Sequence, residues 1–241
     1  MKLNLRKMLV LLLVLSLSFS FVLSAKIIKA SFAKMPQYSE NVDKGVLIDL
    51  IKAIEKTLGE KIERVVVPFP RSVNNVIEGK ADFHVPIIEL PESKSKNLPY
   101  DYSTETIFHV NFALYTNKTK AIEIKNLKNL NLETDRAHID YFEFPIKPSA
   151  GIENSLKKIA AGRIDGFIFA DFATDPVLKK LKFSNIKRQL FKVYDVKIIL
   201  SKGTKGGAID KKISVAIAKL KKSGEFGKIM SIIDKPYKDL K

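Results

Sequence analysis

One short phrase occurs twice in the sequence and limits the folds that are open to the chain. Each copy consists of a glycine, a basic residue, an apolar residue and an aspartate: Gly79, Lys80, Ala81 and Asp82, then Gly162, Arg163, Ile164 and Asp165. Apolar residues at helical spacing precede each copy, and a short apolar run follows it. Glycine takes the left-handed conformation at a helix end without steric cost. Each phrase therefore predicts a helix, a tight turn and a buried strand, in that order.

The distance between the two copies narrows the choice of architecture. Asp82 and Asp165 lie 83 residues apart, which is too far for the period of a solenoid. The spacing favours two α/β lobes, each with a central strand that the chain enters in the same way. In this interpretation Asp82, Asp165 and Asp49 are structural residues that cap helices or hold turns.

The first 25 residues have the pattern of a signal peptide. Lys2, Arg6 and Lys7 form a basic start, an apolar run extends to Leu23, and small residues follow at positions 24 and 25. A membrane anchor is the competing interpretation, because the run approaches the roughly 20 residues that span a bilayer. The small residues and the strand-like segment after them favour cleavage. We expect an exported, periplasmic protein without stable membrane insertion.

Composition constrains the partners of such a protein. The chain has no cysteine, so neither disulfides nor lipid attachment through cysteine is available, and stability must come from burial. The formal net charge is +16, which invites a nucleic-acid interpretation. Export removes that partner and the basic residues are spread along the chain, so we expect no nucleic acid. Lysines on solvated helix faces explain the charge, with an anionic envelope surface or an acidic solute as alternatives.

The first half of the mature chain alternates strands and helices. Strands are predicted at 26–33 and 62–67, helices at 46–58 and 71–77, and a third strand after the first phrase. This alternation is typical of a parallel sheet with right-handed crossovers. Ligands bind such sheets beyond the carboxyl ends of the strands. The loops at 36–39, 68–71 and 86–92 should lie at that edge.

Several further motifs follow one another along the chain. They are the segments 45–50, 70–71, 90–92, 100–103, 196–203 and 223–227, interleaved with the two phrases. In this order they resemble extracytoplasmic solute-binding proteins of family 3, in the type II periplasmic class, which feed ABC importers of amino acids and other small polar solutes. The resemblance covers essentially the whole mature chain.

The resemblance implies an α/β fold with two lobes that close like a clamshell. Each lobe would be a mostly parallel sheet flanked by helices, and two hinge strands, near 109–115 and 193–200, would join them. The implied domains are a signal peptide at 1–25, a discontinuous first lobe at 26–109 and 200–241, and a second lobe at 110–199. Hinge bending of such lobes is a recognised motion. The resemblance also implies an ABC permease as partner, and we expect a monomer.

The chain departs from the family where α-amino acids are usually bound. Members of that kind carry an arginine shortly after the third strand, because a planar guanidinium holds a carboxylate through two hydrogen bonds. Here Ser93 or Lys94 stands in that place. The usual Gly-Ser/Thr turn of the second lobe has no counterpart around 136–142. A standard α-amino acid is therefore disfavoured as the ligand.

Six side chains are candidates for ligand contacts: Tyr38, Arg71, His84, Glu89, Asp171 and Phe172. Tyr38 lies where the family places a ring over the ligand, with a surface tyrosine as the alternative. Arg71 opens a helix, where the dipole disfavours a positive charge. His84 alternates with apolar neighbours, so a core histidine is the stronger interpretation.

The remaining candidates are two acidic residues, Glu89 and Asp171, and one aromatic residue, Phe172. Glu89 follows the third strand and would suit a cationic ligand group. Asp171 follows the strand after the second phrase, near the place where family members hold a ligand amine, with one residue more than the usual spacing. Phe172 would offer a stacking face beside it. Arg71 or Lys94 would take over the binding of an anion.

The sequence gives little support to catalysis. The three histidines, at 84, 109 and 138, show no metal-binding spacing, and no nucleophile motif or phosphate-binding loop is present. We expect no enzyme activity, no metal and no cofactor. The predicted function is the capture of a small polar, amino-acid-like solute for an ABC importer. The alternatives are a ligand sensor that docks on a membrane receptor, and a dehydratase-like enzyme on the same fold.

Overall fold

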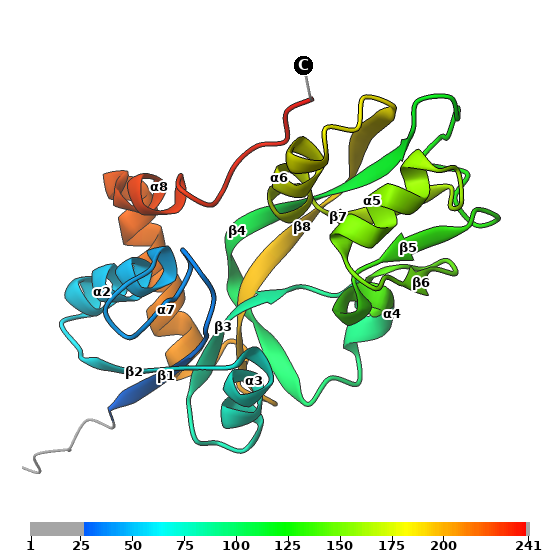
Figure 1. The fold of residues 1–241 in the computed structure, drawn as a ribbon. Coiled ribbons are helices and arrows are strands. Elements are labelled where there is room, and N and C mark those ends of the chain that lie inside the picture. The colour runs from blue at the N-terminus through cyan, green and yellow to red at the C-terminus, as the bar shows by residue number, and fades with distance from the viewer. Residues whose placement is uncertain (1–26, 240–241) are drawn as a thin grey trace, which may run out of the picture.

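The computed structural model describes residues 27–239, which form two lobes joined by long strands (Figure 1). The predicted signal peptide lies outside the described residues. Among the described residues, no helix is both long and apolar enough to cross a membrane.

All strands join one mixed sheet of order β2-β1-β3-β8-β4-β7-β5-β6. In the first lobe, β1 (Ile28–Ala33) pairs in parallel with β2 (Ile62–Val67) and β3 (Phe83–Ile88). In the second lobe, β5 (Leu132–Thr134) pairs in parallel with β6 (Lys147–Pro148) and β7 (Gly166–Ala170). The antiparallel pair β4 (Tyr100–Asn117) and β8 (Ile186–Ser201) runs through both lobes. These two strands are longer than the predicted hinge segments.

Helices cover the sheet in each lobe. The first lobe carries α2 (Val46–Leu58), α3 (Phe69–Ile77), the short α4 (Glu92–Ser95), α7 (Ala208–Ser223) and α8 (Glu225–Met230). The second carries the 3-10 helix η1 (Arg136–Tyr141), α5 (Ile152–Ala160) and α6 (Asp171–Leu181). In Figure 1, α2, α7 and α8 lie together on one side of the first lobe.

The repeated phrase forms the same turn in both lobes. Gly79 and Gly162 each have φ of 70°, in the left-handed region. The next residue donates its N–H five residues back, from Lys80 to Asn75 O over 2.7 Å and from Arg163 to Lys158 O over 2.9 Å. This is the bond that closes a Schellman motif at a helix end. The turn predicted at each phrase is therefore present.

The two aspartates then tie each phrase to a neighbouring strand. Asp82 accepts the N–H of Lys29 over 2.8 Å and returns its own N–H to Lys29 O over 2.8 Å. Asp165 does the same with Asn131, over 2.7 Å and 2.9 Å. An aspartate at this point sets the register of β3 beside β1 and of β7 beside β5. That shared task explains why the same phrase occurs twice.

The strand β4 packs against a core on each face of the sheet in the second lobe. Phe112 and Leu114 join the main core, while Ala113 and Tyr115 join a separate cluster with α5. This follows from the alternation of side chains along a strand. The pairing of β4 with β8 shifts register between Tyr102 and Phe108 and again between Phe112 and Ala113.

Candidate ligand-binding cleft

A cleft of about 480 Å³ lies between the two lobes. Its walls come from the loop after β1, the start of α3, the end of β3, the middle of β4 and β8, η1 and the junction of β7 with α6. The lining residues are Met35, Tyr38, Phe69, Pro70, Pro86, Ile87, Ile88, Phe108, Val110, Phe112, Ala137, His138, Tyr141, Phe169, Ala170, Phe172 and Val196. Nearly all of them are apolar or aromatic.

Tyr38 is held in the cleft by the start of α2. The carbonyl of Tyr38 accepts the N–H of Leu47 over 2.9 Å, and the carbonyl of Gln37 accepts that of Val46 over 3.0 Å. These bonds satisfy N–H groups that the first turn of a helix leaves unpaired. Gly45 makes the close approach possible, because a Cβ there would lie 2.4 Å from Tyr38 O and its φ is 136°. Burial, and secondarily the charge of Asp171, raises the pKa of Tyr38 to about 12, so its hydroxyl stays protonated.

Phe112 on β4 is the centre of an aromatic floor. Its ring centroid lies 4.8 Å from that of Tyr194, 5.6 Å from that of His138 and 5.6 Å from that of Phe169, with the rings steeply inclined. Edge-to-face pairs of this kind add about 0.5–1.5 kcal/mol each beyond the burial of their area. The rings of this floor come from β4, β7, β8 and η1. Their packing therefore fixes the part of the cleft wall that the second lobe contributes.

A buried polar chain supports the wall of the first lobe. Asn75 donates to Ser31 over 3.1 Å, the hydroxyls of Ser31 and Ser72 lie 2.8 Å apart, and Ser72 Oγ lies 2.6 Å from His84 Nδ1. His84 Nε2 lies 3.1 Å from the carbonyl of Pro86. A carbonyl only accepts, so Nε2–H is the donor and Nδ1 of the neutral ring accepts from Ser72. The chain holds β1, α3 and β3 together directly behind Phe69, whose ring lies edge-on to His84 at 5.3 Å.

Three contacts connect the lobes, and two of them join residues that line the cleft. Tyr141 of η1 donates its hydroxyl to Ile88 O over 3.2 Å. Ser93 donates to Glu143 over 3.0 Å, and the rings of Tyr38 and Phe172 approach to 6.0 Å between centroids. Each contact joins the first lobe to the second. The lobes therefore meet around the cleft in this structure.

His138 gives the cleft a polar group. Burial lowers the pKa of His138, partly offset by the neighbouring Asp135, so the ring is neutral at pH 7. Its Nδ1 lies 3.0 Å from Asp135 Oδ1 and must donate the hydrogen to that carboxylate. The other ring nitrogen, Nε2, is then an acceptor, and no group among residues 27–239 donates to it.

Asp171 is the first residue of α6, between Ala170 and Phe172 of the cleft wall. Its Oδ2 accepts from Asn111 of β4 over 3.1 Å. Burial raises the pKa of Asp171, while the bond from Asn111 opposes that change. The carboxylate also lies at a helix start, where negative charge is favoured.

The six predicted contact residues are distributed over several environments. Tyr38 and Phe172 line the cleft, and Asp171 lies beside it. His84 is fully buried behind Phe69, outside the lining. Arg71 is exposed on α3 and makes no ion pair with any residue that the structure describes. As ligand contacts, all six remain predictions.

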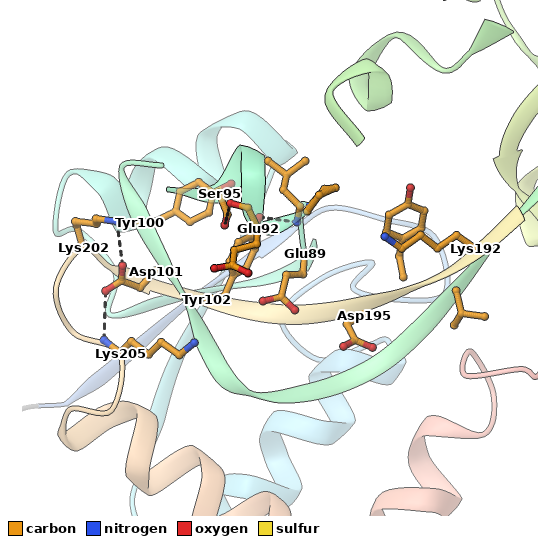
Figure 2. A pocket seen from close by; sticks show the side chains of 14 residues that line it. Glu89, Glu92, Ser95, Tyr100, Asp101, Tyr102, Lys192, Asp195, Lys202 and Lys205 are labelled. Atoms are coloured by element: carbon orange, nitrogen blue, oxygen red, sulfur yellow. Dashed lines mark hydrogen bonds and ion pairs between the residues drawn. The ribbon is translucent and has the colours of Figure 1, made fainter. Parts of the chain in front are cut away.

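Glu89 points into a second hollow of about 610 Å³, which Figure 2 shows from close by. On β8, Val196 faces the cleft, while Asp195 on one side of it lines this hollow and Lys197 on the other pairs with Glu89 at 3.6 Å. Adjacent side chains of a strand point to opposite sides, so Glu89 and Asp195 lie on the face of β8 opposite to Val196. Within the hollow, Lys202 and Asp101 form an ion pair at 3.3 Å.

Several lining residues were missed by the sequence analysis. Phe108, Val110 and Phe112 follow each other at every second position of β4, a strand signal that marks one face but not what it faces. Phe169 belonged to a predicted strand, and Phe69 lies just before a predicted helix. His138 and Tyr141 lie in η1, a 3-10 helix of six residues without periodicity. Among the described residues, no group of three His, Asp or Glu side chains is placed to hold a metal ion.

The described residues form a two-lobed α/β fold with a largely apolar cleft between the lobes. The family model for bacterial extracellular solute-binding proteins, family 3, matches residues 28–232, and the chain belongs to this family. The resemblance stated from the motifs is therefore confirmed. No curated protein matches the chain.

Solved structures share the fold at low sequence identity. The GluR0 ligand-binding core from Nostoc punctiforme, in complex with L-glutamate, has 15% identity and a TM-score of 0.60 over 86% of this chain and 100% of that chain. A histidine kinase sensor domain with similarity to periplasmic binding proteins has 15% identity and a TM-score of 0.60, covering 86% and 95%. The arginine-, lysine-, histidine-binding protein ArtJ from Geobacillus stearothermophilus has 15% identity and a TM-score of 0.57, covering 88% and 97%. These likenesses confirm the predicted two-lobed fold.

Proposed function

We propose that this protein captures one small solute in the cleft between its lobes, outside the cytoplasm, and delivers it to an ABC importer. The observation that carries the proposal is the cleft itself, which takes its walls from both lobes and is bridged by the contacts of Tyr141 with Ile88 and of Tyr38 with Phe172. Membership of the solute-binding family supports the same reading. A volume of about 480 Å³ is in the usual range for small-molecule sites.

Ligand binding to the folded state should raise the melting temperature. A ligand at a hundredfold excess over its Kd stabilises by about 2.7 kcal/mol. We would measure thermal unfolding of the protein with amino acids, polyamines, organic acids, short peptides and aromatic amines. A rise for one chemical class, together with a smaller radius of gyration in solution scattering, is the expected result.

A variant that fills the cleft provides the control. Ala137 lines the cleft from η1 and is exposed, so Ala137→Trp adds bulk there without disturbing the core. The thermal shift should be lost in this variant. A shift that survives Ala137→Trp, or the absence of any shift across the panel, would contradict the proposal.

Ligand sensing is the second candidate function, because the fold is shared with a histidine kinase sensor domain. Deleting the gene separates the two. Loss of cellular uptake of the bound solute would support delivery to an importer. Unchanged uptake together with a lost signalling response would favour the sensor.

A further inference from the structure

We infer that the cleft takes an apolar, ring-bearing solute that donates hydrogen bonds through its polar group and carries no carboxylate. The inference rests on the proposed function and names the chemical class of its ligand. It differs from the polar, amino-acid-like solute expected from the sequence.

Positive charge is absent from the cleft wall. Of the described residues, no lysine or arginine lines it. Arg71 and Lys94 are exposed and lie outside the lining, and Lys197 pairs with Glu89 at 3.6 Å on the opposite face of the strands. A buried carboxylate without a cation or several donors is strongly disfavoured. An anionic ligand would therefore lose its hydration without compensation.

Aromatic rings from both lobes provide the binding surface. Eight of the seventeen lining residues carry a ring, counting His138. Phe69 and Phe172 face the cleft from opposite lobes and are 41% and 51% exposed, so a large part of each side chain remains accessible to a ligand. A flat ligand ring packed against either of them would gain both area burial and stacking.

The polar groups near the rings act mainly as acceptors. His138 Nε2 has a free lone pair, and the protonated Tyr38 hydroxyl can accept as well as donate. Asp171 does not line the cleft, but its charge acts on the Tyr38 hydroxyl. The matching ligand group is an N–H or O–H, and an ammonium would gain further from Asp171 and the ring faces.

The first test uses N-phenyl-1-naphthylamine, an uncharged aromatic amine that fluoresces in apolar surroundings. We expect saturable binding of one probe per protein. Phe172→Ser should weaken it at least tenfold, because the variant removes one wall of the ring site. Val215→Ser is the matched control, since Val215 is 52% exposed on α7, outside the cleft, and this variant should bind the probe unchanged. No saturable binding, or equal loss in both variants, would overturn the inference.

The second test compares two competitors that share one ring system. 1-Naphthylmethylamine should displace the probe at a concentration at least tenfold lower than 1-naphthoate, whose carboxylate finds no cation in the cleft. Equal displacement by the two, or no displacement by the amine, would overturn the inference. If glutamate or arginine closes the lobes while the probe fails to bind, the ligand class is wrong and the proposed function stands. If the probe binds in the cleft but no bound solute reduces the radius of gyration, the proposed function fails instead.

Discussion

At the residue scale, His84 shows how burial changes the role of a candidate contact. Its ring is fully buried, donates to Pro86 O and accepts from Ser72. Burial lowers the pKa of His84 from 6.5 to about 4. The neutral ring is thus part of the folded structure, and protonation would break the chain of hydrogen bonds behind Phe69.

This predicts a pH dependence of stability. The unfolded chain binds the His84 proton below about pH 6.5, whereas the folded state resists it down to about pH 4. The contribution of His84 is complete above pH 6.5 and is lost as the pH falls toward 4. We expect the free energy of unfolding to fall by about 2 kcal/mol more between pH 7 and 5 than in His84→Gln. Urea unfolding of both proteins at several pH values measures the difference, and parallel curves would contradict it.

At the scale of the element, the turn that follows the helix in each copy of the phrase also holds neighbouring segments of the chain. Asp165 accepts the N–H of Asn131 over 2.7 Å and pairs with Lys120. The bond to Lys120 lowers the pKa of Asp165, so the carboxylate is charged at neutral pH. One side chain therefore joins the start of β7 to β5 and to the loop after β4.

Removing that carboxylate should destabilise the second lobe. We expect Asp165→Ala to lower the free energy of unfolding by about 1–3 kcal/mol, because a half-buried N–H loses its acceptor. Asp49→Ala serves as the control, since Asp49 is exposed in the first turn of α2 and its helix-dipole contribution is at most about 1 kcal/mol. Urea midpoints of the two variants test this. If Asp49→Ala lost as much stability as Asp165→Ala, the prediction would be wrong.

At the scale of the whole molecule, the C-terminal segment connects the two lobes. In Figure 1 it leaves α8 and runs toward α6. Asn111 donates to Lys235 O over 2.9 Å, and Arg188 donates to Lys238 O over 2.9 Å. The ring of Tyr237 lies 4.6 Å from the Arg188 guanidinium. Only 5% of the Arg188 side chain is exposed, and the C-terminal segment helps to bury it.

Shortening the chain should expose that arginine. A protein that ends at residue 233 loses the contacts to Asn111 and Arg188 and the bonds of Asp234 to His109. We expect its melting temperature to fall by about 4–8 °C, which corresponds to about 2 kcal/mol in a chain of this size. A protein that ends at residue 239 keeps these contacts and should melt like the full chain. Differential scanning calorimetry of the three proteins measures the effect. Identical melting temperatures would show that the segment adds no stability.

The elements with strong local sequence signals were predicted most accurately. The predicted helix 46–58 and strand 62–67 coincide with α2 and β2, because the apolar period is regular and Gly59 ends the helix. The helix α6 was not predicted, since its apolar pattern is weak and Pro176 lies inside it. The short elements β5, β6 and η1 offer too few residues for any period.

The sequence by itself determined the two-lobed α/β fold, its entry turns and the absence of the usual carboxylate-binding arginine. These properties depend on residue type and local spacing, which a linear chain displays directly. The family resemblance already predicted Tyr38 and Phe172 beside the ligand, but only the tertiary structure decided that Phe69, Phe112 and His138 share one cleft with them while Glu89 faces the opposite side. Such contacts join segments far apart in the chain, and a shift of one position along a strand reverses the face of every side chain. No local pattern carries that information.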